Sequence, residues 1–554
     1  MNLPDDVGVR RYPDRVSLQS LPALLRNEAA MTSVVGARGA TLAVATPAQA
    51  FVLAGLLRLG TRRPVLIVTP TGQAASQLAH DLEVFAGVRS DGPSSVEVFP
   101  AWETLPFERV SPEVHTMGRR LRLLWHLGGP DAGEMIGPDI VVAPIKAVLQ
   151  RLGPWRTAAR PVVVERGDQV VVDQLVADLV ALGYRRESLV EHRGELAVRG
   201  GIVDVFPSTA DEPIRIDLWG DEVDRLTRFD VADQRSTDDL DRVELFGCRE
   251  LVADQAMRDR AAALVGAAPW GRQQWDRIAD GQQFDGMESW LPWLVEGEEL
   301  LCDLLGDDAL VVLVEPRRVR DRASELLDEE SALADALADT WGLEAGGDAP
   351  RLHAPFERLL TGTPAGVVSL VPTADGPDVP QVESRGWEPI MGDGSRMAGQ
   401  VRSLSESGYS VVLCAASVGG AERLSGLLAE EGLVVPVAGP SDDLAVPGAR
   451  IVVGSVDRGF VLPGCRVAVL AESDVTGRMR PHRQARTRAR PVDGFFDDLA
   501  PGNYVVHRQH GVALYGGMVT RTMGGATRDY HAGSGCDASL EYRRYASLFR
   551  HSAR

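Results

Sequence analysis

Short apolar runs, each followed by a helical run or a turn, recur along this chain and limit its fold more than any other feature. The run 64–70 (PVLIVTP) precedes the helical spacing of 71–85, and the run 139–144 (DIVVAP) precedes another helical stretch. Similar runs return farther along the chain, at 366–372, 407–417, 449–455 and 465–473. Uniformly apolar strands that alternate with helices are typical of parallel sheets covered on both faces. The sequence therefore predicts an α/β protein.

The chain is too long for one hydrophobic core. Its 554 residues predict several domains of about 100–200 residues each. With 44% hydrophobic and 25% charged residues it has the composition of ordinary globular domains, and no stretch offers the roughly 20 apolar residues of a membrane span. No basic start followed by an apolar core is visible at the N-terminus, so we expect a cytoplasmic protein without a membrane anchor.

Charge and lysine content argue against two classes of site. The net charge of −20 at pH 7 opposes general binding to nucleic acid, so DNA contact is expected to be weak or absent. Lys146 is the only lysine among 58 basic residues, and no glycine-rich loop precedes it. A P-loop needs G-x-x-x-x-G-K-[ST], in which the lysine reaches the terminal phosphates. We predict no Walker-type nucleotide site and no catalytic residues.

Cysteines and histidines give no metal site. The five cysteines are scattered without a C-x-x-C pair. His507 and His510 lie three residues apart on an expected strand, where their side chains would point to opposite faces. The run 478–490 (RMRPHRQARTRAR) holds six arginines and is interpreted as a solvated linker, with a phosphate contact or an acidic partner surface as the alternative.

The run EPIRIDLWG places an aromatic residue on the polar face of a strand. Alternation puts Ile214, Ile216 and Leu218 on one face, which leaves Arg215, Asp217 and Trp219 on the other. The strand before it, GIVDVFP, is entered through Arg199 and two glycines that let the backbone pass close to a neighbour. An exposed aromatic residue with arginine is typical of an interface hot spot, whereas a second layer over this face would make Trp219 core. Periodicity alone does not separate the two.

Acid–base chemistry is the weaker interpretation of the same strands. Asp204 and Asp217 are the carboxylates available there, and no His, Ser or Cys stands at an informative spacing from either. Elsewhere, the aromatic and proline-rich segment 99–113 (FPAWETLPFERVSPE) is interpreted mainly as a packed loop. Neither segment indicates catalysis.

Four runs together resemble one family. They are AWETLPFERVSPE, EHRGELAVRGGIVDVFPSTADEPIRIDLWGDEVDRLTRFDVADQRS, GMESWLPWL and YVVHRQHGVALYGGMVTRTMGGATRDY. In this order, from about residue 15 to Tyr530, the chain resembles the N-terminal half of bacterial transcription-repair coupling factors, whose first domains are similar to the excision-repair protein UvrB. Near Gly36, GARGATLAVAT has no lysine where a motor would place one, as in the family's degenerate first domain.

The resemblance implies a multidomain α/β fold with one insertion. The implied parts are a degenerate helicase-like α/β domain at 15–151 and 248–345, a UvrA-binding α+β module inserted at 152–247, a small α/β domain at 351–476, an Arg-rich linker at 477–496 and the start of a β-barrel at 497–530. It also implies UvrA binding through Arg199, Arg215 and Trp219. The family more often has phenylalanine at the position of Trp219.

The function implied is transcription-coupled nucleotide excision repair, in which the chain recruits UvrA to stalled RNA polymerase. In the family a barrel binds the polymerase β subunit, and motor domains use ATP and Mg²⁺ to translocate on DNA. After Tyr530 this chain departs from the pattern, so we expect an incomplete barrel, an aberrant tail at 531–554, no polymerase-binding residues that can be assigned and no motor or cofactor. The alternatives are a residual DNA-dependent nucleotide hydrolase and an inert truncated product.

Overall fold

The computed structural model describes residues 18–87, 95–104, 110–129, 137–295, 297–341, 350–388, 390, 393–439, 442–476, 504–507, 511–523 and 526–535. The chain divides into two compact units, Met1–Pro481 and His482–Arg554.

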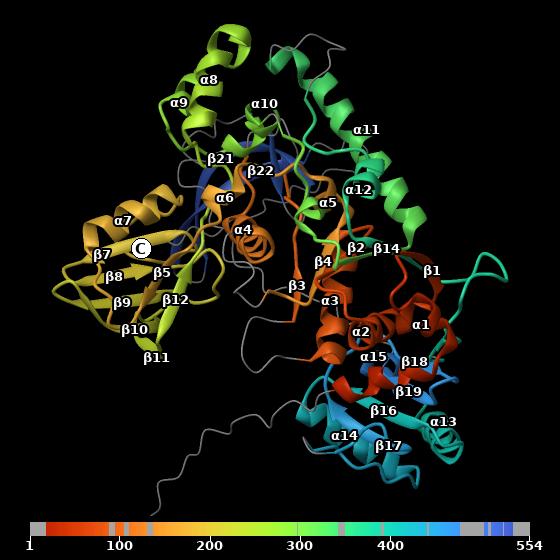
Figure 1. Cartoon of the computed structure of the whole chain (residues 1–554). Helices are drawn as coiled ribbons and strands as arrows, with labels where there is room; N and C mark the ends of the chain where they lie inside the picture. The colour runs from red at the N-terminus through yellow and green to blue at the C-terminus, as the bar shows by residue number, and fades with distance from the viewer. Residues whose placement is uncertain are drawn as a thin grey trace, which may run out of the picture. The chain divides into compact units, whose positions relative to one another are not determined.

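An all-parallel six-stranded sheet is the centre of the N-terminal α/β domain (Figure 1). Its strands, in spatial order, are β1 (Gly39–Ala43), β14 (Gly366–Val371), β13 (Leu310–Val314), β2 (Val65–Thr69), β4 (Ile140–Pro144) and β3 (Val96–Val98). Strands β2, β4 and β13 are buried at every position, as expected for a parallel sheet covered on both faces. The predicted α/β architecture is confirmed.

Helices cover this sheet and follow its strands. They are η1 (Leu18–Asn27), α1 (Ala29–Val34), η2 (Thr46–Ala48), α2 (Gln49–Leu59), α3 (Gly72–Ala86), α4 (Val114–Gly128), α5 (Ile145–Leu149), α6 (Trp155–Ala158), α11 (Pro316–Trp341) and α12 (Phe356–Gly362). The Thr71 side chain caps α3 by accepting a hydrogen bond from the backbone N–H of Ala74. Residues 18–27 form a 3₁₀ segment that contains Pro22, which has no N–H to donate.

A tryptophan cluster holds together the helical segments between residues 255 and 294. These segments are α8 (Gln255–Ala267), η3 (Pro269–Gly271), α9 (Arg272–Ala279), η4 (Met287–Trp290) and α10 (Leu291–Leu294). The next segment, η5 (Leu301–Leu304), packs into the core of the first sheet. The rings of Trp275 and Trp290 meet edge to face with centroids 4.6 Å apart, and Trp270 stacks on Trp290. The run GMESWLPWL is therefore core of this layer.

A second, smaller sheet belongs to the C-terminal part of the first unit. Its strands, in spatial order, are β15 (Arg385–Gly386), β18 (Phe460–Leu462), β19 (Val467–Leu470), β16 (Ser410–Ala415) and β17 (Gly448–Val453). Its helices are α13 (Gly394–Glu406), α14 (Val418–Glu430) and α15 (Glu472–Thr476). The run 366–372 was expected here, but β14 pairs instead with β1 and β13 in the first sheet. The sequence of an apolar strand does not show which of two sheets it joins, because that depends on the strands with which it forms hydrogen bonds.

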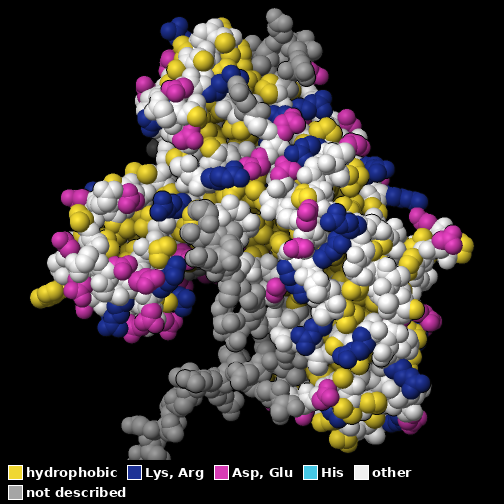
Figure 2. All heavy atoms as spheres, viewed as in Figure 1, with side chains coloured by type: hydrophobic (Ala, Val, Ile, Leu, Met, Phe, Trp, Pro, Cys, Tyr) yellow, Lys and Arg dark blue, Asp and Glu magenta, His cyan; other side chains and the backbone are white. Residues whose placement is uncertain are grey.

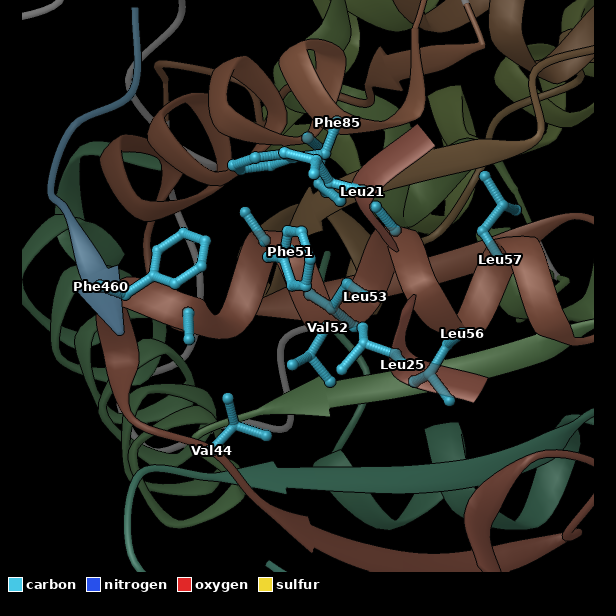
Figure 3. Close-up of a cluster of buried hydrophobic side chains, with 14 of the residues drawn as sticks. Leu21, Leu25, Val44, Phe51, Val52, Leu53, Leu56, Leu57, Phe85 and Phe460 are labelled. Atoms are coloured by element: carbon cyan, nitrogen blue, oxygen red, sulfur yellow. The ribbon is translucent and has the colours of Figure 1, made fainter. Parts of the chain in front are cut away.

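The two sheets share one hydrophobic core. The ring of Phe51, on α2, lies with its centroid 5.3 Å from that of Phe85, on α3, and 5.3 Å from that of Phe460, on β18 (Figure 3). The same buried cluster includes Val65 of the first sheet and Val467 of the second. The first sheet thus extends past the expected boundary near residue 350, to β14, and the two sheets share the buried cluster between them.

The second unit is described by the course of its backbone. Strands β20 (Tyr504–His507), β21 (Gly511–Met523) and β22 (Ala526–Gly535) form an antiparallel sheet in that order. Because Gly535 pairs with Ala513, β22 continues five residues past Tyr530, where the strand pattern was expected to end. Backbone hydrogen bonds to the long β21 do not require alternating side chains. Residues 536–554, His510 and the Arg-rich run lie outside the described residues.

Candidate functional site

An inserted α+β module carries the residues that the sequence singles out. Its sheet has the spatial order β11 (Ser236–Leu240), β10 (Glu222–Phe229), β9 (Ile214–Trp219), β8 (Ile202–Val205), β7 (Glu195–Arg199) and β6 (Arg185–Arg186). The pair β5 (Val162–Glu165) and β12 (Arg242–Leu245) lies beside it, and α7 (Val172–Ala181) lies along one face (Figure 1).

Strand β9 alternates as its sequence predicts. Ile214 and Ile216 are buried and pack, with the half-buried Leu218, into the core formed with Leu175 and Leu179 of α7. The other face of β9 carries Arg215, Asp217 and Trp219. These polar residues and the tryptophan therefore lie on the face away from α7.

Trp219 is exposed to solvent. It is 84% exposed at the end of β9, directly before the Gly220–Asp221 turn into β10. The alternative that a second layer makes it core is wrong in this chain. A large aromatic side chain in this position is available to a partner.

Arg199 lies at the tip of the β7–β8 hairpin. Its guanidinium is half-exposed, and its Nη2 donates a hydrogen bond of 2.7 Å to Asp204. Gly200 has φ of +61°, and a Cβ at Gly201 would lie 2.8 Å from the carbonyl oxygen of Leu218. The two glycines thus permit the close approach that the sequence predicts. They fix the tip beside the end of β9, because Leu218 N–H also donates to Gly201 O at 2.8 Å.

Arg215 is directed inward more than its place on the polar face suggests. Its side chain is 17% exposed, and its Nε and Nη2 donate to the two carboxylate oxygens of Asp204 at 2.7 and 3.0 Å. Its Nη1 donates to the carbonyl of Gln234, and its guanidinium carbon lies 4.8 Å from the centroid of Phe229. The hydrogen bonds that Arg215 donates to Asp204 are the main cause of the raised pKa of Arg215.

Asp204 was considered from the sequence only as an acid–base carboxylate, and its pairing with the two arginines was missed. It is fully buried on β8, directly opposite Arg215 in the register, and it accepts hydrogen bonds from both arginines. A carboxylate within the apolar run GIVDVF is the available sequence signal, since a buried charge needs a partner. Asp217, on the same face, has a raised pKa caused mainly by partial burial, and nothing in its contacts indicates acid–base chemistry.

The segment 99–113 is a packed structural element in its described residues. Trp102 Nε1 and Arg120 Nε each donate to Glu250 at 2.7 Å, and both Arg120 and Glu250 are buried. Arg249 Nη1 donates to the buried Glu288 at 3.1 Å. A network of this kind joins this segment to the helical layer, which supports the packed-loop interpretation.

Lys146 and the backbone N–H groups of the loop after β1 make hydrogen bonds to other parts of the chain. Lys146 Nζ donates to the carbonyls of Trp102 and Thr104 at 2.8 and 3.2 Å. After β1, the backbone N–H of Val44 donates to Val371 O and that of Ala45 to Ser384 Oγ. These N–H groups are therefore engaged by the chain itself at the strand end where a nucleotide-binding loop would cradle phosphate.

The described residues form neither a membrane-spanning helix nor a cluster of metal ligands. No helix in the described part of the chain has the length and hydropathy to cross a membrane. Within the same residues, no group of three metal-ligating side chains comes together. Cys248, Cys302, Cys414 and Cys465 are free thiols.

Family models match three segments of the chain. The UvrB interaction domain matches residues 162–251, which contain the module with Arg199, Arg215 and Trp219. The D3 domain of MFD matches residues 404–475, in the second sheet. The CarD-like/TRCF RID domain matches residues 499–532, in the second unit.

Relatives match nearly the whole chain. The transcription-repair-coupling factor of Mycobacterium bovis is 33% identical over 529 residues, which cover 89% of this chain and 42% of the relative. Those of Bacillus subtilis and Myxococcus xanthus are 26% and 29% identical and cover 85% of this chain each. The chain spans about two fifths of the length of these curated relatives. By sequence, it corresponds to the N-terminal region of the transcription-repair-coupling factor family.

Proposed function

We propose that this chain serves transcription-coupled nucleotide excision repair by recruiting UvrA to stalled RNA polymerase. The module at 162–251 is the proposed UvrA-binding part, with Arg199, Arg215 and Trp219 as its site. Support comes from the match to a UvrB interaction domain and from the names of the relatives. The polar face of this sheet is the surface on which the proposal rests.

One observation carries the proposal: Trp219 is 84% exposed on a strand whose opposite face is buried. An exposed indole on the same face of a sheet as an arginine is typical of residues that dominate protein interfaces. On the face of this module that Figure 2 shows, acidic and basic side chains are mixed, a distribution that does not favour nucleic acid. A protein partner with an apolar pocket fits this chemistry.

The test is a calorimetric titration of the purified chain with UvrA. Trp219→Ala should weaken binding by about 30-fold or more, since truncation of such an anchor costs roughly 2–4 kcal/mol. The melting temperature should stay unchanged, because the indole lies mostly in solvent. Val434→Ala, which truncates another highly exposed apolar side chain, in the loop after α14 and outside the module, is the control. Equal affinities of the wild type and Trp219→Ala would refute the proposed site.

Contact with RNA polymerase is a separate proposal that rests on the match at 499–532. The family's barrel implies the β subunit as the partner. Retention of RNA polymerase by the immobilised chain, and loss of retention when residues 499–554 are deleted, would support it. The UvrA titration is independent of this outcome.

We also propose that this chain itself is not an ATPase. The absence of a P-loop lysine and the internal hydrogen bonds of the Val44 and Ala45 N–H groups support this, because a phosphate would have to displace them. The assay is ATP hydrolysis by the purified chain with and without DNA. Turnover that DNA stimulates would overturn this proposal and favour the hydrolase alternative.

A further inference from the structure

We infer that Asp204 is the positioning residue of the UvrA-binding surface, and that Arg215 acts through Asp204 rather than by touching the partner. The inference rests on the proposed function, which treats Arg199, Arg215 and Trp219 as three contacts. The structure divides them into an anchor, Trp219, a donor, Arg199, and an internal brace formed by Asp204 and Arg215.

The geometry of Asp204 links three neighbouring strands. The carboxylate lies on β8, buried, between Arg199 at the end of β7 and Arg215 on β9. One of its oxygens accepts from Arg215, and the other accepts from both arginines. Hydrogen bonds that pair charged groups are short and directional, so this carboxylate fixes the orientation of both guanidinium groups.

The donors of the two arginines are used differently. A guanidinium has five N–H donors. Three N–H groups of Arg215 donate within the module, two to Asp204 and one to the carbonyl of Gln234. Its guanidinium group also lies near the ring of Phe229. Arg199 makes a single hydrogen bond within the described residues, to Asp204, and is half-exposed. Arg199 is therefore the arginine with donors left for a partner.

Register places Arg199 and Trp219 on the same face and at the same end of the sheet. Arg199 is opposite Ile202, Ile202 is opposite Asp217, and Trp219 is two residues beyond Asp217. Strands β7 and β9 flank β8, so the backbones of the two residues lie about 10 Å apart across the strands and about 7 Å apart along them, or roughly 12 Å in all. The partner feature that fits is a hydrogen-bond acceptor, such as a carboxylate, next to an apolar pocket for the indole.

The brace is tested first without UvrA, by modifying arginines with phenylglyoxal and locating the products by mass spectrometry. In the wild type, Arg199 should react and Arg215 should be protected. Asp204→Asn should raise the reaction rate of Arg215 several-fold. Asp211→Asn, which removes the carboxylate partner of Arg193 in the same module, is the control and should leave Arg215 protected. Reaction of Arg215 as fast as Arg199 in the wild type would overturn the inference.

A double-mutant cycle with UvrA then tests the positioning role. Asp204→Asn should weaken UvrA binding about tenfold in the wild type and have little effect in the Arg199→Ala background, because it acts through Arg199. An unchanged affinity of Asp204→Asn, or an equal loss in both backgrounds, would refute it. Absence of UvrA binding by the wild type and Trp219→Ala alike would refute the proposed function instead, and the modification experiment would still decide the brace.

Discussion

Asp81 provides a sharp test of how the two sheets are joined. It lies on α3, and its Oδ1 accepts a hydrogen bond of 3.0 Å from the backbone N–H of Asp457, in the loop before β18. Burial, together with the negative charge of Asp457, raises the pKa of Asp81 from 3.8 to about 7. The ionised carboxylate is therefore disfavoured at this junction.

The sign and size of the effect follow from linkage. The folded state holds a proton on Asp81 between about pH 4 and pH 7 that the unfolded state has lost, so stability falls as the pH rises through this window. A shift of about three units corresponds to at most about 4 kcal/mol. Because Asp81 is partly exposed, solvent screening reduces the expected effect to about 2 kcal/mol.

Asp81→Asn removes the charge and keeps an oxygen that can accept from Asp457 N–H. We expect its melting temperature to match that of the wild type at pH 4 and to exceed it by about 2–4 °C at pH 8, as measured by calorimetry. Glu83→Gln changes an exposed carboxylate on the same helix and should shift the melting temperature little at either pH. A difference between Asp81→Asn and the wild type that does not depend on pH would refute the reasoning.

Three further substitutions probe the packing described above by urea unfolding. Glu250→Ala leaves Arg120 buried without its partner and should cost about 3–5 kcal/mol, whereas Asp375→Ala, which breaks an exposed pair with Arg317, should cost less than about 1 kcal/mol. Equal effects would contradict the role given to burial. Phe460→Ala should cost about 3–5 kcal/mol by opening the core that both sheets share, and a loss below about 1 kcal/mol would show that the sheets pack independently.

The sequence predicted local structure well where a run was uniformly apolar or alternated regularly between apolar and polar residues. The uniformly apolar run PVLIVTP became the buried strand β2, and the alternation of EPIRIDLWG became β9 with Ile216 buried and Trp219 exposed. Periodicity reports which face of an element is apolar, and that information is local.

Assignments that depend on a distant partner were beyond the sequence. Strand β14 reads like the strands of the second sheet, yet its hydrogen bonds go to β1 and β13. Strand β22 pairs with the long strand β21 as far as Gly535, although its sequence does not alternate between apolar and polar residues.

The candidate site shows the same division. The residues of EPIRIDLWG determined by themselves that an arginine and a tryptophan share the polar face of a strand. Only the tertiary structure decided that Trp219 is uncovered, and that Asp204 binds Arg199 and Arg215 together. The physical reason is that exposure and ion pairing are properties of neighbouring strands, whose register brings together side chains that lie apart in the sequence.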